Sequence, residues 1–123
     1  MALPTVRFRV DFGDGHAVGP GKISLLEQID EGGSLSQAAR DLDMSYRRAW
    51  QLLKSMNASF REPVALSCKG GRGGGGATLT AFGRELIRSY RVFEAEIQRR
   101  AARRFRPLGR GTRKARLARS RAR

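Results

Sequence analysis

The stretch that decides the fold runs from residue 34 to residue 60 and reads SLSQAARDLDMSYRRAWQLLKSMNASF. Ser34 suits an N-cap, and Gln37 three positions later completes a capping box, so a first helix begins here. Its apolar positions recur at i, i+3, i+4 and i+7, namely Leu35, Ala38, Ala39 and Leu42. Residues 43–44 form a turn, and Ser45 can cap a second helix. The stretch therefore predicts two helices joined by a tight turn.

The second helix has two unlike faces. The apolar face consists of Ala49, Leu53, Met56 and Phe60, with Leu52 at its margin. At about 100° per residue, the opposite face holds Arg47, Gln51 and Lys54, with Arg48 and Ser55 beside them and Tyr46 and Trp50 at its edges. Such a face can enter a major groove of DNA, where Arg pairs with guanine and Gln with adenine. Two ordinary amphipathic helices with a solvated charged face show the same periodicity, so the flanking segments have to decide.

Size and charge indicate one domain and a polyanionic partner. The chain has 123 residues and a formal net charge of +14. The charge is uneven, because residues 99–123 hold 12 of the 25 Lys and Arg residues and none of the 11 acidic residues. Residues 1–98 therefore carry a net charge of only +2.

Rare residue types exclude several classes of site. The single cysteine, Cys68, rules out an intramolecular disulfide and a cysteine-based zinc site, and fits a reducing compartment. The single histidine, His16, is expected to be a surface turn residue rather than a metal ligand. The sequence shows neither an apolar run of membrane-spanning length nor a signal peptide. We expect a cytoplasmic protein without a membrane partner.

The residues before the helical pair predict a strand, a turn and a helix. Residues 5–12 alternate, with Val6, Phe8, Val10 and Phe12 on one face, which predicts a half-buried strand. Residues 13–16 form a glycine-containing turn. A helix opens at Pro20, carries an inner stripe of Ile23, Leu25, Leu26 and Ile29, and ends at Gly32-Gly33.

A glycine-tipped hairpin follows the helical pair. Residues 64–67 and 77–79 read as two strands, and residues 69–76 between them contain six glycines together with Lys69 and Arg72. No Gly-Lys-Ser/Thr sequence follows, so this is not a phosphate-binding loop of the Walker type. We interpret it as a wing whose cations and backbone N–H groups approach DNA phosphates. A plain linker is the alternative.

The last part of the chain predicts a long helix and then a tail. Thr80 caps the helix, whose apolar stripe is Phe82, Leu86, Tyr90, Phe93 and Ile97, with Ile87 alongside. Core packing accounts for most of this stripe, and a dimer contact is expected for part of it. We expect a basic, disordered tail over residues 99–123, because Pro107 and two glycines break a helix. The tail either adds salt-dependent contact with phosphates or keeps the protein soluble.

The order of elements predicts a mainly α fold with a small antiparallel β wing, the winged helix–turn–helix. The predicted domain covers residues 1–98 and includes a C-terminal dimerisation helix. Four motifs resemble the N-terminal domain of ModE-type molybdate-responsive regulators and, more distantly, the winged helix of LysR-type regulators. They are Gly19-Pro20-Gly21-Lys22-Ile23, Gly33-Ser34-Leu35-Ser36-Gln37-Ala38-Ala39, Met44-Ser45-Tyr46-Arg47-Arg48-Ala49-Trp50 and Gly70-Gly71-Arg72-Gly73-Gly74-Gly75-Gly76-Ala77.

The resemblance implies a homodimer that binds double-stranded DNA at a near-palindromic operator and represses genes of molybdate transport. It implies that the long helices at the two ends of the domain form the dimer contact. By position, Ser36 and Gln37 approach phosphates, and the wing lies along the duplex. The residues expected at the groove are Ser45, Tyr46, Arg47 and Arg48, which the face analysis extends to Gln51 and Lys54.

One departure from the family bears on ligands. Full-length ModE-type regulators carry C-terminal domains that bind oxyanions, whereas this sequence continues into a basic tail of about 25 residues. We therefore expect no cofactor, because the molybdate-sensing domain is absent, and the small-molecule effector stays open.

Two other function classes compete with the regulator. An architectural or nonspecific nucleic-acid-binding protein would rely on the Arg-rich tail and lose nearly all binding without it. An enzyme would need paired carboxylates, a nucleophile with a base, or a metal cluster. Glu27, Asp30 and Glu31 fit the solvated face of a helix better, so we expect no catalysis.

Overall fold

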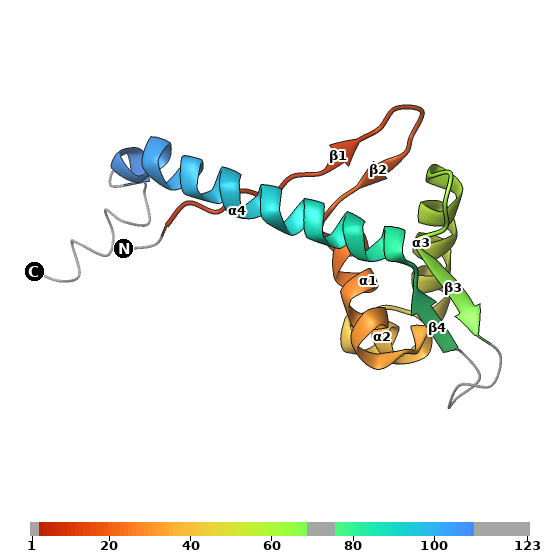
Figure 1. Ribbon diagram of the computed structural model, residues 1–123. Coiled ribbons are helices and arrows are strands. Elements are labelled where there is room, and N and C mark those ends of the chain that lie inside the picture. The colour runs from red at the N-terminus through yellow and green to blue at the C-terminus, as the bar shows by residue number, and fades with distance from the viewer. Residues whose placement is uncertain (1–2, 69–75, 110–123) are drawn as a thin grey trace, which may run out of the picture. The chain divides into compact units, whose positions relative to one another are not determined.

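The computed structural model describes residues 3–68 and 76–109 (Figure 1). Its elements are β1 (Val10–Asp11), β2 (Ala17–Val18), α1 (Pro20–Gly32), α2 (Leu35–Asp41), α3 (Tyr46–Ser59), β3 (Ala65–Cys68), β4 (Gly76–Leu79) and α4 (Ala81–Gly109). The described residues fall into two compact units, one of residues 8–90 and one of residues 3–7 with 91–109. The larger unit has the elements of a winged helix–turn–helix, which confirms the predicted fold class.

Helix α1 is the buried support of the larger unit. It begins after the N-cap Gly19 with Pro20 in the first turn, and it ends at Gly33, whose φ of 66° lies in the left-handed region open to glycine. The predicted inner stripe is fully buried and consists of Ile23, Leu25, Leu26 and Ile29. The predicted bounds and inner face of this helix are therefore confirmed.

Helices α2 and α3 form the predicted pair. The Ser34 hydroxyl caps α2 by accepting from the backbone N–H of Gln37 at 3.2 Å. The Ser45 hydroxyl likewise caps α3 by accepting from the N–H of Arg48 at 3.0 Å. Between them Asp43 takes a φ of 54°, which makes the turn tight. The second half of the capping box is wrong, because the side chain of Gln37 bonds along α2 instead of returning to Ser34.

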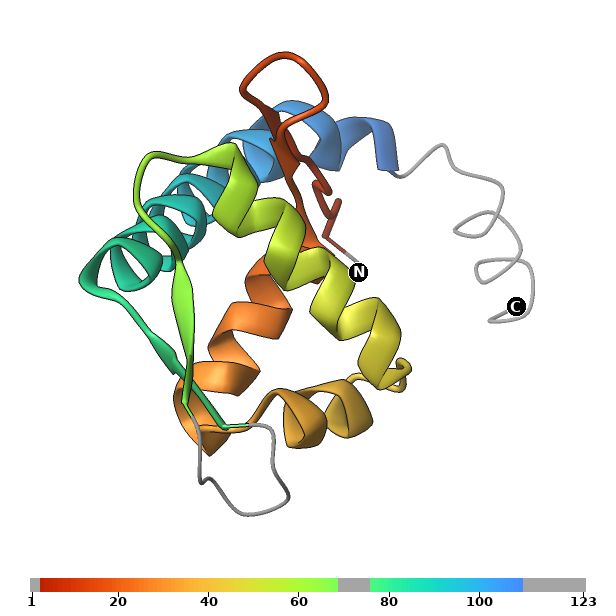
Figure 2. The same ribbon diagram turned by 90° about the vertical axis from the view of Figure 1, so that its right-hand side faces the viewer.

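Strands β3 and β4 form the stem of the wing beside α1 and α2 (Figure 2). They are antiparallel, with Ala65 opposite Leu79 and Cys68 opposite Gly76. The N–H of Ala77 donates to the carbonyl of Gly33 at 3.1 Å, so the stem is also hydrogen-bonded to the chain just before α2. The two predicted strands are confirmed, with β3 shifted by one residue toward the tip and β4 starting one residue earlier than predicted.

Helix α4 starts as predicted, with Thr80 as its cap. The Thr80 hydroxyl accepts from the N–H of Gly83 at 3.0 Å and donates to the carbonyl of Pro63 at 2.6 Å. Gly83 lies so close to the preceding loop that a Cβ at this position would stand 2.1 Å from the carbonyl oxygen of Val64. A glycine inside this helix is therefore explained by close packing.

The predicted strand over residues 5–12 is wrong for most of its length, since only Val10 and Asp11 pair with another strand, the unpredicted β2. The alternating burial is nevertheless present from residue 4 to residue 10. In the larger unit, the carbonyl of Phe8 accepts from the Tyr90 hydroxyl at 2.7 Å. In the smaller unit, the N–H of Val6 donates to Gln98. Side chains of α4 thus take the place of a neighbouring strand.

The predicted boundary of the tail at residue 99 is also wrong. Helix α4 continues through Pro107 to Gly109, and residues 110–123 lie outside the described residues. Residues 99–106 are mostly Arg and Ala, which favour a helix, and Pro107 falls in its last turn, where few intrahelical bonds remain to be lost. Of the predicted tail, at least residues 99–109 are therefore helical.

Candidate nucleic-acid interface

The polar face of α3 points away from the protein. Its apolar side is buried through Ala49, Leu53 and Met56. The predicted groove residues on the other side are all exposed, namely Ser45, Tyr46, Arg47, Arg48, Gln51 and Lys54. The face assignment made from periodicity is therefore confirmed, and this surface is accessible to a large partner.

Aromatic rings shape this surface. Tyr46 and Trp50 are 50% and 46% exposed, which is high for large rings. The ammonium of Lys54 lies 4.9 Å from the centre of the Trp50 ring, a cation–π contact that places its charge beside the ring on the exposed face. The surface therefore presents cations together with apolar edges, the mixture that base edges and thymine methyl groups can contact.

Lys22 adds a cation that the face analysis did not assign. It lies on α1, and its ammonium donates to the carbonyl of Ala17 at 2.7 Å and to the Ser55 hydroxyl at 3.4 Å. Burial, and then the nearby charge of Arg48, lower the pKa of Lys22 below its ordinary value of 10.5. Periodicity puts Lys22 at the margin of the buried stripe without indicating these partners, although the family motif Gly19–Ile23 contains it.

The end of α3 is tied to the turn before β2. The Nδ1 atom of His16 lies 2.8 Å from the Ser59 hydroxyl oxygen, and that hydroxyl donates to the carbonyl of Ser55 at 2.8 Å. Because the hydroxyl proton is already used, Nδ1 must carry the hydrogen that joins it to Ser59. His16 belongs to the predicted turn and acts as a tether rather than as an isolated surface residue.

The two residues of α2 that are predicted to contact phosphates differ in their exposure. Ser36 is half-buried, whereas Gln37 is exposed. The amide of Gln37 donates to Asp41 at 2.8 Å and accepts from Arg40 at 2.9 Å. A phosphate would have to replace one of these bonds to use the Gln37 side chain. Lys69 and Arg72, the predicted cations of the wing, lie outside the described residues.

The described residues offer little support for a metal site, a membrane span or an acidic site on α1. In residues 3–68 and 76–109, no cluster of His, Cys, Asp and Glu has the size that a metal ion needs. No helix in this part is long and apolar enough to span a bilayer. Of the acidic residues on α1, Asp30 pairs with Arg84 at 3.7 Å on the surface.

A capped helix pair with an antiparallel stem hydrogen-bonded beside it defines the winged helix–turn–helix class of DNA-binding domains. No protein-family model matches the chain. It is 43% identical over 82 residues to the DNA-binding transcriptional dual regulator ModE of Escherichia coli K12, covering 67% of this chain and 31% of that protein.

Two further relatives agree. The molybdenum transport protein ModE of Azotobacter vinelandii is 39% identical over 92 residues, which cover 75% of this chain and 34% of that protein. The molybdenum-pterin-binding protein MopB of Rhodobacter capsulatus is 40% identical over 83 residues, which cover 68% of this chain and 31% of that protein. The chain is therefore homologous to the ModE-type transcriptional regulators, as its motifs predict, and spans about a third of their length.

Proposed function

We propose that the chain is a sequence-specific, DNA-binding transcriptional regulator of ModE type, linked to molybdate transport or molybdenum metabolism. The observation that carries this proposal is the outward polar face of α3 on a buried apolar support. The similarity to a DNA-binding transcriptional regulator and to a molybdenum transport protein supports the same function. A regulator of this kind acts on chromosomal DNA in the cytoplasm.

Different residues on and beside the polar face of α3 are proposed to make different kinds of DNA contact. Arg47 and Gln51 lie one turn apart on the outer face, so they can reach base edges of neighbouring pairs. Each good bidentate contact discriminates against a wrong base by about 1–3 kcal/mol. Arg48 and Lys22, close enough for the charge of Arg48 to lower the pKa of Lys22, are suited to phosphates. The wing cations Lys69 and Arg72 are proposed to contact the backbone as well.

A homodimer is part of the proposal. Beyond residue 90, α4 exposes Val92 and Phe93, which are 52% and 46% accessible. Two adjacent large apolar side chains on a helix surface favour cover by another copy of the same helix. A symmetric dimer predicts two half-sites about one helical turn apart, and footprinting would reveal that dyad directly.

We also propose that DNA binding by these residues needs no cofactor, because the cations and hydrogen-bonding groups of the face are all protein side chains. Calorimetry of the chain with molybdate and with tungstate tests this point. Heat of binding at micromolar oxyanion, together with a change in DNA affinity, would contradict it.

The decisive experiment compares Arg47→Ala with Arg88→Ala on DNA fragments that precede molybdate-transport genes. Arg88 is a matched control, because it is exposed on α4 and, among the residues that the structure describes, its ion pair is with Glu85, at 3.2 Å. We expect Arg47→Ala to weaken binding to the selected site by about 1–3 kcal/mol and to relax the base preference at one position. Circular dichroism should show an intact fold for both variants.

The control should bind the same site as tightly as the original chain. Equal affinity of the original chain for the selected site and for random duplex at physiological salt would overturn the proposal. So would an Arg47→Ala variant that retains full sequence preference.

A further inference from the structure

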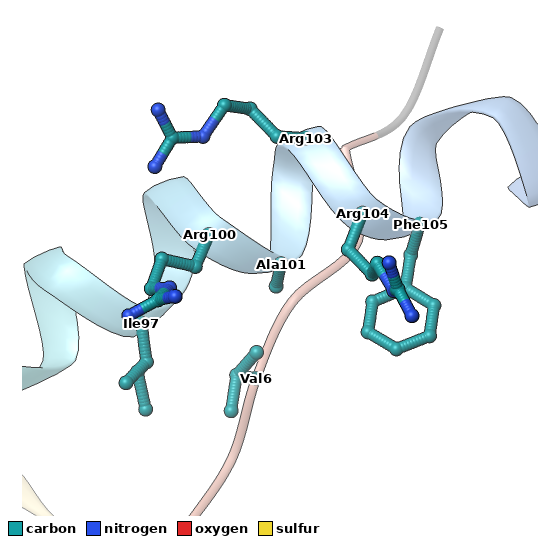
Figure 3. Close-up of a pocket in the computed structure, with 7 residues that line it drawn as sticks. All are labelled: Val6, Ile97, Arg100, Ala101, Arg103, Arg104 and Phe105. Carbon is teal, nitrogen blue, oxygen red and sulfur yellow. The ribbon is translucent and has the colours of Figure 1, made fainter.

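The smaller unit contains an open groove of about 690 Å³ between residues 3–7 and α4. Val6, Ile97 and Ala101 form its apolar floor. The side chains of Arg100 and Arg104 flank that floor (Figure 3), whereas Arg103 extends from the other side of the helix. This groove has no part in the helix–turn–helix.

The floor of the groove is held by a specific contact. The side chain of Gln98 accepts from the N–H of Val6 at 2.9 Å and donates to the carbonyl of Pro4. Its amide thus satisfies the backbone of the extended segment on both sides, and Ala101 below is only 6% exposed. The groove is therefore a built feature of this unit and does not depend on a flexible side chain closing over it.

The positive charge of the groove favours an anionic ligand. Arg100 and Arg104 lie one turn apart, where like charges repel, and neither forms an ion pair in the described part of the chain. From residue 97 to residue 123 the sequence contains no acidic residue.

The exposed ring of Phe105 indicates which kind of anion fits the groove. Phe105 is 51% exposed and lies beside Arg104 at the end of the groove (Figure 3). A duplex keeps its bases stacked inside, so it would meet the guanidinium groups but leave the ring and the apolar floor without partners. A single strand offers unstacked bases along with its phosphates, and cationic grooves with exposed aromatic rings are suited to it.

We infer that this groove binds single-stranded nucleic acid, with Arg100 and Arg104 on neighbouring phosphates and one base stacked on Phe105. The site uses none of the α3 residues of the proposed function. A single strand that forms next to a bound duplex, or a transcript, would supply such a ligand.

The test measures fluorescence anisotropy of the full chain with a labelled 12-nucleotide oligo(dT) and with a hairpin duplex of similar charge. We expect Phe105→Ala to weaken binding of the single strand roughly tenfold, the loss typical of one stacked base, and to leave the duplex unaffected. The double variant Arg100→Gln with Arg104→Gln should reduce the magnitude of the salt slope for the single strand by about 1.4, which corresponds to two phosphates.

Two controls make the outcome unambiguous. Arg61→Gln with Arg88→Gln removes the same charge from exposed positions outside the groove and should change the slope much less. Arg47→Ala should keep single-strand binding whether or not it loses duplex specificity, so that failure of one proposal is not failure of the other.

Three results would overturn the inference. Phe105→Ala could leave the affinity for the single strand unchanged, or the duplex could lose as much affinity as the single strand. In the third case, the groove variants would shift the oligomeric state in sedimentation, and a second copy of the chain would then be the occupant. Circular dichroism of each variant verifies that the helix content is retained.

Discussion

Helix α3 and the end of α4 both carry exposed cations, but the two helical segments differ in how much of their other side is buried. The cations of α3 stand on a helix whose other side is sealed by the core, through Ala49, Leu53 and Met56. In residues 91–109, by contrast, only Ala101 is buried, and several apolar side chains remain half-exposed. The residues packed behind a cationic helix face therefore fix the direction in which that face points. The polar face of α3 has a fixed direction, whereas the end of α4 offers a groove that is bordered by one extended segment.

The largest effect is expected where α4 packs against the loop before β3. Gly83→Ala places a methyl group 2.1 Å from the carbonyl oxygen of Val64, which is backbone and cannot turn aside. We expect a loss of about 3 kcal/mol in the free energy of unfolding, the upper range for overpacking, measured by denaturation in urea.

Gly21→Ala is the matched control, because it changes a glycine inside α1 with nothing within 4 Å of the new atom. The helix propensity of alanine should stabilise that variant by about 0.5–1 kcal/mol. Equal stabilities of the two variants would mean that α4 does not pack closely against the loop at Val64.

The next effect concerns the link between α3 and the wing. The side-chain oxygen of Asn57 accepts from the N–H of Val64 at 2.7 Å, and its amide donates to the carbonyl of Ala65 at 3.1 Å. Asn57→Ala leaves both backbone groups without these partners, so we expect a loss of about 1–3 kcal/mol in the free energy of unfolding.

Gln51→Ala on the exposed side of the same helix should change stability by less than about 0.5 kcal/mol. If both variants melt at the same temperature in calorimetry, the Asn57 amide does not join α3 to β3. The comparison with Gln51 separates loss of this link from a general change in helix propensity.

Local signals predicted the helix–turn–helix well. Caps at Ser34 and Ser45, glycines at the end of α1 and strict periodicity are short-range features, and each acts within a few residues. Partners distant in sequence were not predictable in this way. The contacts of Gln98 with Pro4 and Val6 span more than 90 positions, and they make residues 3–9 resemble a strand without a strand partner.

The same limit applies to the candidate interface. The exposed residues of α3 follow from its period, whereas Lys22 reaches Ser55 across 33 positions. The continuation of α4 past residue 99 is not predictable from local signals for a different reason. Pro107 is a strong local signal for a break, but a proline close to a helix end removes little, and the Arg and Ala residues before it favour the helix.

The smallest predicted effect concerns Lys22 and the change of stability with pH that its lowered pKa causes. Because burial and Arg48 lower the pKa of Lys22 in the folded protein, the unfolded chain binds the proton more tightly. The contribution of Lys22 to stability should therefore rise with pH in the window between its lowered pKa and 10.5, and it should be constant below that window. In Lys22→Met this rise is absent, while the rest of the pH dependence is retained.

Urea denaturation of both proteins between neutral pH and pH 10.5 measures the difference in slope. A parallel pair of curves would mean that Lys22 is as well hydrated in the folded chain as in the unfolded one. The donor contacts to Ala17 and Ser55 would then not hold its ammonium at the margin of α3. The cation would in that case be as loosely placed as the arginines at the end of α4, and the contrast between the two helices would be confined to α3 itself.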